Sequence, residues 1–257
     1  VTGVQTCALP ISVGNLGQSG EGWFDNTGLM QGMRNKARSR GVDYIVDEVV
    51  AIGRSGQRIT SATLASGRTI TCGTLVNAAG PWAPQAAALL GVTSDVSPQR
   101  RSAIQVHLAA PLDGIHPFTM NYIPGVNRLG AYVRHEAADR LICGLHSEDL
   151  LDPASDPDDY ARGVTQHWQE ELAEQLAFRF PGLADGMAFG EGWSGLYPCR
   201  PSREPAIGWR RDVEGVIDAV GFGGGGIQSG PAAGVIVRDW LLHDEQRTIP
   251  SAASLAP

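Results

Sequence analysis

Apolar and polar positions switch between helical and strand spacing over the first ninety residues. Leu29, Met30, Met33 and Ala37 recur as on one face of a helix over 28–40, and 25–27 supplies its N-terminal cap. Strand patterns follow at 42–52, 58–65 and 68–72, the last two forming a hairpin around 65–67. A short apolar strand at 74–80, expected to be central in its sheet, then ends in a glycine turn before a helix over 83–90. This order is typical of dinucleotide-binding domains.

The pattern changes near residue 94. Candidate strands at 102–108, 130–135 and 141–145 precede a loop at 152–159 and a long acidic helix over 158–178. We interpret this part as a second, mainly antiparallel domain inserted into the first. The fold class is therefore α/β, or α+β overall, with domain segments 13–93, 94–186 and 187–243 and a disordered tail at 244–257.

The first twelve residues differ from the rest of the chain. The run Val-Thr-Gly-Val-Gln-Thr-Cys-Ala-Leu-Pro-Ile looks like a translated sequencing adapter, and no Met begins it. We expect 1–12 to be an artefact and the remainder to be the C-terminal part of a longer protein. The alternative is a natural, weakly patterned tail.

A glycine-rich stretch at 221–234 follows a buried strand at 216–220 and opens a helix over 227–242. Free N–H groups and the positive end of the helix dipole favour negative charge there, and glycines let a ligand approach the backbone. The other interpretation is a tight turn packed against the sheet.

Composition narrows the possible functions. The net charge of −7 argues against a nucleic-acid surface. The sequence contains no run of about twenty apolar residues, so it does not indicate membrane association. Cys72, Cys143 and Cys199 lie far apart without C-x-x-C spacing, which favours a reducing cytoplasm, and we expect a bacterial protein. The six histidines show no metal-binding spacing, so no metal is expected.

Three motifs in order carry a resemblance to a known family. Leu-Val-Asn-Ala-Ala-Gly-Pro-Trp at 75–82, Trp-Ser-Gly-Leu-Tyr-Pro at 193–198 and the glycine-rich stretch resemble the flavoprotein family of glycine oxidase, D-amino-acid oxidase and sarcosine oxidase. Residues 21–25 and 143–147 resemble the branch of FAD-dependent oxidoreductase domain-containing protein 1 and its bacterial relatives. The resemblance implies a Rossmann-like FAD-binding domain and a substrate domain.

The resemblance also implies a non-covalent FAD site, since Gly195 stands where sarcosine oxidase has its flavin-linking Cys. The family's opening β-α-β unit has no counterpart in this chain, and 14–17 is no substitute, so we expect the main phosphate-binding turn to be missing and this chain to bind FAD weakly or not at all. By position, the cofactor-binding residues are Val49, Ala79, Gly80, Trp82, Gly223, Gly224, Gly225, Gly226, Ile227 and Gln228. The alternative role of Val49 is core packing.

For the substrate, the resemblance implies an amino or imino acid whose carboxylate binds a cation. Arg101, Tyr132 and Gln228 align with pocket residues of D-arginine dehydrogenase, although Arg101 can equally be a surface cation. Tyr197 stands where relatives have a second carboxylate-binding Arg. No catalytic base is predicted.

The resulting hypothesis is oxidation of an amino-acid or secondary-amine C–N bond by hydride transfer to FAD, with oxygen or an electron-transfer partner as acceptor. A different class, a flavin-binding assembly or scaffold protein with little catalysis, is the alternative, because a mammalian relative of the resembling branch is associated with assembly of a respiratory complex. A non-flavin α+β domain with coincidental glycines is a third possibility.

Overall fold

A computed structural model describes residues 22–121, 129–147, 155–159 and 163–257 of the chain, which forms two compact units. The antiparallel unit contains the described parts of Val1–Val46, Ser102–Leu151 and Gly163–Trp193. The mixed unit contains Asp47–Arg101, the described part of Asp152–Arg162, and Ser194–Pro257. The units change over at 101/102 and 193/194, compared with 93/94 and 186/187 in the sequence interpretation. The segments 1–12 and 14–17, the expected artefact and the rejected phosphate turn, lie outside the described residues.

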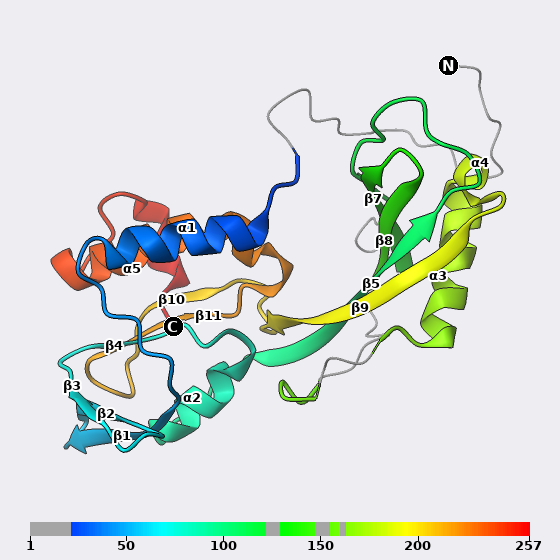
Figure 1. Ribbon diagram of the computed structural model, residues 1–257. Helices are drawn as coiled ribbons and strands as arrows, with labels where there is room; N and C mark the ends of the chain where they lie inside the picture. Colours follow the sequence, from blue (N-terminus) through cyan, green and yellow to red (C-terminus); the bar gives the residue numbers. More distant parts are fainter. Residues whose placement is uncertain (1–21, 122–128, 148–154, 160–162) are drawn as a thin grey trace. The chain divides into compact units, whose positions relative to one another are not determined.

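A five-stranded sheet forms the centre of the antiparallel unit (Figure 1). Its order is β6 (Thr119–Met120), β7 (Leu129–Ala137), β8 (Arg140–Ser147), β5 (Ser97–His107) and β9 (Ala188–Cys199). Helix α3 (Gln166–Arg179), followed by α4 (Pro181–Ala184), packs Trp168, Leu172 and Leu176 into the same apolar cluster as the buried side chains of β5, β7 and β8. The expected inserted antiparallel sheet is therefore confirmed.

Helix α1 (Asn26–Arg38) also belongs to this unit, and its start agrees with the predicted cap. Asp25 Oδ1 accepts a hydrogen bond from the backbone N–H of Gly28 at 2.9 Å, which satisfies one donor of the first turn. None of the residues of helix α1 is buried.

Two three-stranded sheets build the mixed unit. Strands β1 (Val49–Ser55), β2 (Arg58–Leu64) and β3 (Thr69–Thr71) pair antiparallel in that order. In the second sheet β10 (Ala206–Trp209) pairs antiparallel with β11 (Val216–Val220), and β11 pairs parallel with β4 (Leu75–Asn77). The turn η1 (Gly80–Trp82) leads from β4 into α2 (Ala83–Leu89), and η2 (Gly223–Gly225) leads from β11 into α5 (Gly226–His243). Helix α5 packs on β10 through Ile236 and Ile207.

Four sequence expectations need correction. Strand β1 begins at residue 49 rather than 42, because the β-branched residues before it have no strand partner in the described structure. Helix α3 begins at residue 166 rather than 158, after Thr165 Oγ1 accepts from the N–H of Trp168 at 3.2 Å. Strand β4 lies at the edge of its sheet among the described strands and is not central.

The fourth correction concerns the C-terminal tail, which is folded and not disordered. Residues Pro250–Leu255 form a 3-10 helix, η3, with Ala252 buried against the cluster of α5 and β10. Asp239 of α5, fully buried, accepts backbone N–H groups of Arg247 at 3.0 Å and Thr248 at 2.7 Å. These bonds tie the tail to α5 and explain its order.

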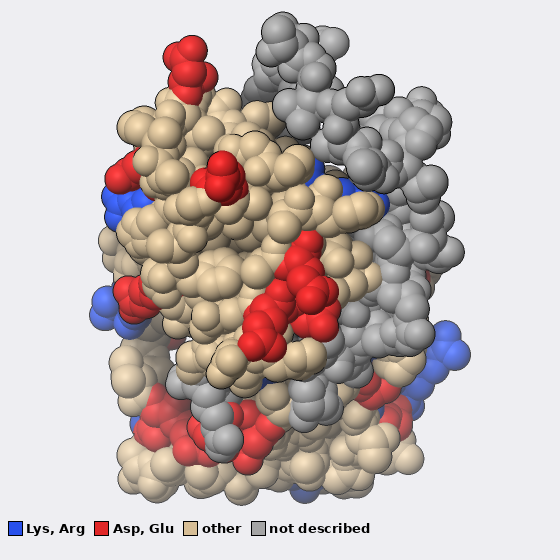
Figure 2. All heavy atoms as spheres, turned by 90° about the vertical axis from the view of Figure 1, so that its right-hand side faces the viewer, with Lys and Arg blue, Asp and Glu red and all other residues tan. Residues whose placement is uncertain are grey.

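Acidic side chains gather on the face shown in Figure 2. Figure 2 shows a group of Asp and Glu near the middle of the described part of that face, with Lys and Arg at its sides and in its upper part. This distribution agrees with the negative net charge of −7. In the described part of the chain, no helix is long and apolar enough to span a membrane.

Candidate functional site

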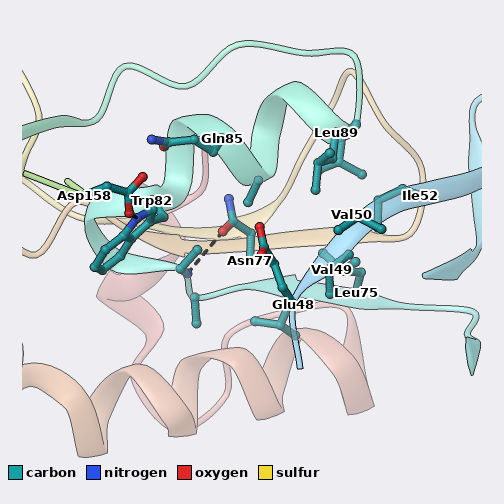
Figure 3. A pocket seen from close by; sticks show the side chains of 15 residues that line it. Glu48, Val49, Val50, Ile52, Leu75, Asn77, Trp82, Gln85, Leu89 and Asp158 are labelled. Carbon is teal, nitrogen blue, oxygen red and sulfur yellow. Dashed lines mark hydrogen bonds between the residues drawn. The ribbon is translucent and has the colours of Figure 1, made fainter. Parts of the chain in front are cut away.

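A cavity of about 900 Å³ lies within the mixed unit, between β1, β4, the turn η1 and α2. Apolar side chains of β1 and α2, including Val50, Ile52 and Leu89, lie at one end in Figure 3, and Trp82 with Asp158 lies at the other. Its volume is within the range of about 300–1,000 Å³ that is usual for small-molecule sites. The lining residues are Glu48, Val49, Val50, Ile52, Leu75, Val76, Asn77, Ala78, Ala79, Trp82, Gln85, Ala86, Leu89, Leu90 and Asp158.

The turn after β4 begins at a buried amide. Asn77 is 3% exposed, and its Oδ1 accepts from the backbone N–H of Ala79 at 3.2 Å (Figure 3). Gly80 then takes φ +55°, a left-handed conformation that glycine adopts without strain, and a Cβ there would meet no atom within 4 Å. The backbone of this turn is therefore open to a ligand.

Trp82 closes the same turn. Its indole Nε1 donates to Asp158 Oδ1 at 2.8 Å, and both side chains line the cavity. Asp158 lies 76 residues further along the chain. Position 158 was expected where the loop 152–159 meets the helix 158–178, with no role at this cavity.

A second cluster in the mixed unit surrounds the start of α5. The guanidinium carbon of Arg101 lies 5.7 Å from the ring centroid of Tyr197, a cation–π geometry. The Tyr197 ring in turn occupies the space beside Gly224, because a Cβ on Gly224 would lie 2.5 Å from its Cε2 atom. The structure thus brings together Arg101 and Tyr197, which the resemblance assigns to the substrate, and the glycine-rich stretch, which it assigns to the cofactor.

Two donors of Arg101 are already used by its own strand. Nη1 donates to the carbonyl of Arg100 and Nη2 to Gln99 Oε1, each at 2.9 Å. These bonds orient the guanidinium, and a guanidinium has five N–H donors in all. Burial raises the pKa of the neighbouring Cys199 thiol, although the Arg101 charge acts in the opposite direction.

The remaining predicted residues lie at the helix start and in the other unit. Ile227 and Gln228 are exposed in the first turn of α5, directly after η2. Tyr132 lies on β7 of the antiparallel unit, where it stacks on Phe118 with ring centroids 6.0 Å apart. The cofactor and substrate roles of all these residues stay predictions.

Three further polar residues near the cavity were missed: Asp158, Asp218 and Arg210. The signal for Asp218 was present, because a lone carboxylate interrupts the apolar strand Val-Ile-Asp-Ala-Val of β11. Within the described ranges, no group of three His, Cys, Asp or Glu side chains is placed to hold a metal ion.

Comparison with known proteins gives the class. Residues 5–240 match the model of the DAO family, the FAD dependent oxidoreductases, and the chain belongs to that family.

The particular relatives refine this result. The chain is 27% identical over 281 residues to the bovine (Bos taurus) FAD-dependent oxidoreductase domain-containing protein 1, covering 93% of this chain and 54% of the relative. Iminodiacetate oxidase from Chelativorans sp. BNC1 superposes with a TM-score of 0.68 at 27% identity, over 89% of this chain and 57% of that one. L-proline dehydrogenase from P. horikoshii shares the fold, with a TM-score of 0.72 at 22% identity over 87% and 57%. The chain spans about half the length of the curated relatives it matches.

Proposed function

We propose that the protein oxidises the C–N bond of an amino acid or a secondary amino acid with FAD as cofactor. The cluster of Arg101, Tyr197 and Gly224 beside the N-terminus of α5 carries this proposal. A planar guanidinium matches the geometry of a substrate carboxylate, and the Tyr197 hydroxyl can donate a further hydrogen bond to it. Bound FAD would supply the redox chemistry, as acceptor of a hydride from the substrate Cα with oxygen or an electron-transfer partner as the final oxidant.

The residues present fit an adenosine-containing cofactor. The cavity beside Val49 has apolar walls suited to a base, and Glu48 adds a carboxylate that can accept from ligand N–H or O–H groups. Open space at Gly80 and Gly223, where a Cβ would meet nothing within 4 Å, lets a ligand touch the backbone. The N–H groups at the start of α5, from Gly226 onward, favour negative charge on the ligand.

The test is a substrate screen on the protein expressed from its complete gene. The flavin absorbance should bleach anaerobically with at least one secondary or D-amino acid. Arg101→Met should raise KM by about 10- to 100-fold, because a charge-assisted hydrogen bond contributes about 1.5–3 kcal/mol. Arg58→Met is the matched control, since Arg58 is an exposed cation of the same unit that pairs with Glu214. Tight FAD binding with no bleaching by any such substrate would contradict the proposal.

A further inference from the structure

A chain of polar side chains runs from Asn77 in the cavity wall through buried Asp218 and Arg210 to the half-exposed Asp212. Asn77 Nδ2 donates to Asp218 Oδ1 at 3.1 Å, and Arg210 Nη1 donates to Asp218 Oδ2 at 2.6 Å. The side chains of Arg210 and Asp218 are only 9% and 4% exposed. Both carboxylate oxygens of Asp218 are therefore engaged, one by a neutral amide and one by a cation.

The outer end of the chain is anchored as well. Arg210 Nε and Nη2 donate to the two oxygens of Asp212 at 2.8 and 2.7 Å, and Nη2 also reaches the carbonyl of Thr93 at 3.1 Å. Arg210 is thus held in one orientation by a bidentate carboxylate and by a backbone acceptor in the segment after α2. Its remaining Nη1 faces Asp218.

This arrangement determines which way the Asn77 amide points. Its nitrogen must face the Asp218 carboxylate, because only a donor can bind there, so its oxygen faces the backbone N–H of Ala79. A flipped amide would place its oxygen against the carboxylate and its NH₂ against the Ala79 N–H. The Asp218 carboxylate therefore fixes the Asn77 amide, and the Asn77 amide fixes the position of Ala79 at the start of the turn.

We propose that Asn77, Asp218 and Arg210 are positioning residues that hold the Ala79–Trp82 turn in its ligand-binding conformation. The part of this inference that concerns FAD rests on the proposed function. A buried ion pair contributes little net stability relative to well-packed apolar residues, because desolvation offsets the attraction, so a geometric role accounts better for its presence here. Asp158 holds the other end of the turn through Trp82.

Two double variants isolate the acceptor that faces Asn77. Arg210→Met with Asp218→Leu removes the ion pair and leaves the Asn77 nitrogen without its acceptor. Arg210→Met with Asp218→Asn also removes the ion pair, but it restores a carbonyl oxygen where Asp218 Oδ1 stood. Arg58→Met with Glu214→Leu, an exposed pair of the same unit, controls for the loss of any salt bridge.

The first measurement is amide hydrogen exchange at Ala79 in the 257-residue chain without ligand. Exchange should accelerate at least tenfold in the double variant with Asp218→Leu, and it should lie within about threefold of the parent chain in the double variant with Asp218→Asn. It should stay unchanged in the Arg58→Met, Glu214→Leu control. The unfolding midpoint should change little in any of these variants. If the Leu variant does not fold, Asn77→Ala takes its place with the same expected acceleration. Equal exchange in the Leu variant, or in its substitute, and in the Asn variant would overturn the inference.

The second measurement is FAD titration of the complete-gene protein carrying the same substitutions. The Kd should rise at least tenfold in the Leu variant and recover in the Asn variant. Absence of FAD binding by the complete-gene protein would refute the proposed function while the exchange result still decides the role of Asn77, Asp218 and Arg210. Wild-type affinity in a Leu variant whose Ala79 exchange has accelerated would show that the turn does not bind FAD, and would overturn that part of the inference.

Discussion

Adding one methyl group at Gly224 should separate substrate binding from stability. The backbone of Gly224 does not have the positive φ that would strain alanine, so the change acts through space alone. Its Cβ would lie 2.5 Å from Cε2 and 2.8 Å from Cζ of Tyr197, closer than real Cβ contacts allow. Either the Tyr197 ring or the backbone of η2 must move.

The magnitude follows from the exposure of the ring. Overpacking in a rigid core costs about 1–3 kcal/mol, but Tyr197 is 38% exposed and can turn toward solvent. The stability lost is then the cation–π contact with Arg101, about 0.5–1 kcal/mol at such a site. The lower entropy of the unfolded alanine chain returns about 0.4–1 kcal/mol. We therefore expect Gly224→Ala to change the free energy of unfolding by less than about 1 kcal/mol.

Its effect on the substrate should be larger, because the displaced ring carries its hydroxyl away from the proposed carboxylate site beside Arg101. The KM of the complete-gene protein should rise about tenfold, which corresponds to a loss of about 1.4 kcal/mol. Gly234→Ala is the matched control, since Gly234 lies further along α5 and its Cβ would meet nothing within 4 Å. Urea unfolding and steady-state kinetics of both variants provide the assay. An unchanged KM in Gly224→Ala, or the same increase in both variants, would refute the reasoning.

Three other predictions concern individual groups. The pKa of the Asp239 carboxyl is lowered, mainly by the hydrogen bond from the backbone N–H of Thr248. The ionised carboxyl therefore stabilises the fold above the unfolded pKa of about 4, and this stabilisation is lost as the pH falls through the lower folded value. Asp239→Asn should abolish this part of the acid dependence when unfolding is measured against pH, and an unchanged profile would contradict the assignment. Burial raises the pKa of the Cys143 thiol to about 12, so at pH 8 it should react with iodoacetamide only after unfolding, and mass spectrometry showing alkylation of the folded chain would disprove this. Gly144→Ala should destabilise the antiparallel unit by about 1–3 kcal/mol, because its Cβ would overlap the ring of Tyr132 on the paired strand, and thermal unfolding at the parent midpoint would contradict the packing.

Local signals in the sequence predicted most elements because their causes are local. The Asp25 cap and the short apolar run before Gly80 are read within a few residues, and both are found in the structure. The predicted start of β1 at residue 42 was wrong because β-branched residues form a strand only where a partner strand is available. Strand β2 pairs with β1 only from Val49 onward. The prediction of a disordered tail at 244–257 was wrong because the order of the tail depends on Asp239, a residue of the preceding helix.

In the candidate site, too, features that depend on neighbouring residues were predictable and long-range partners were not. The glycine turns were inferred from residue type and order, whereas Arg101 and Tyr197 were placed only by the family resemblance, and the structure brings these two side chains together. The partners Asp158 and Asp218 lie 76 and 141 residues from the side chains they bind, so no short pattern connects them. Only a charge inside an apolar strand hinted that Asp218 has a specific partner.

The parallel pairing of β4 with β11 has a consequence for the order of folding. The strands meet across 141 residues at the Asn77–Asp218 contact, and closing so long a flexible loop costs about 4 kcal/mol from its logarithmic length dependence alone. The β7–β8 hairpin lies within that loop and closes over only a few residues. Early folding of this inserted segment would shorten the effective loop, so the parallel contact should form late. The Ala79 turn should then be among the last parts of the mixed unit to acquire protection during refolding.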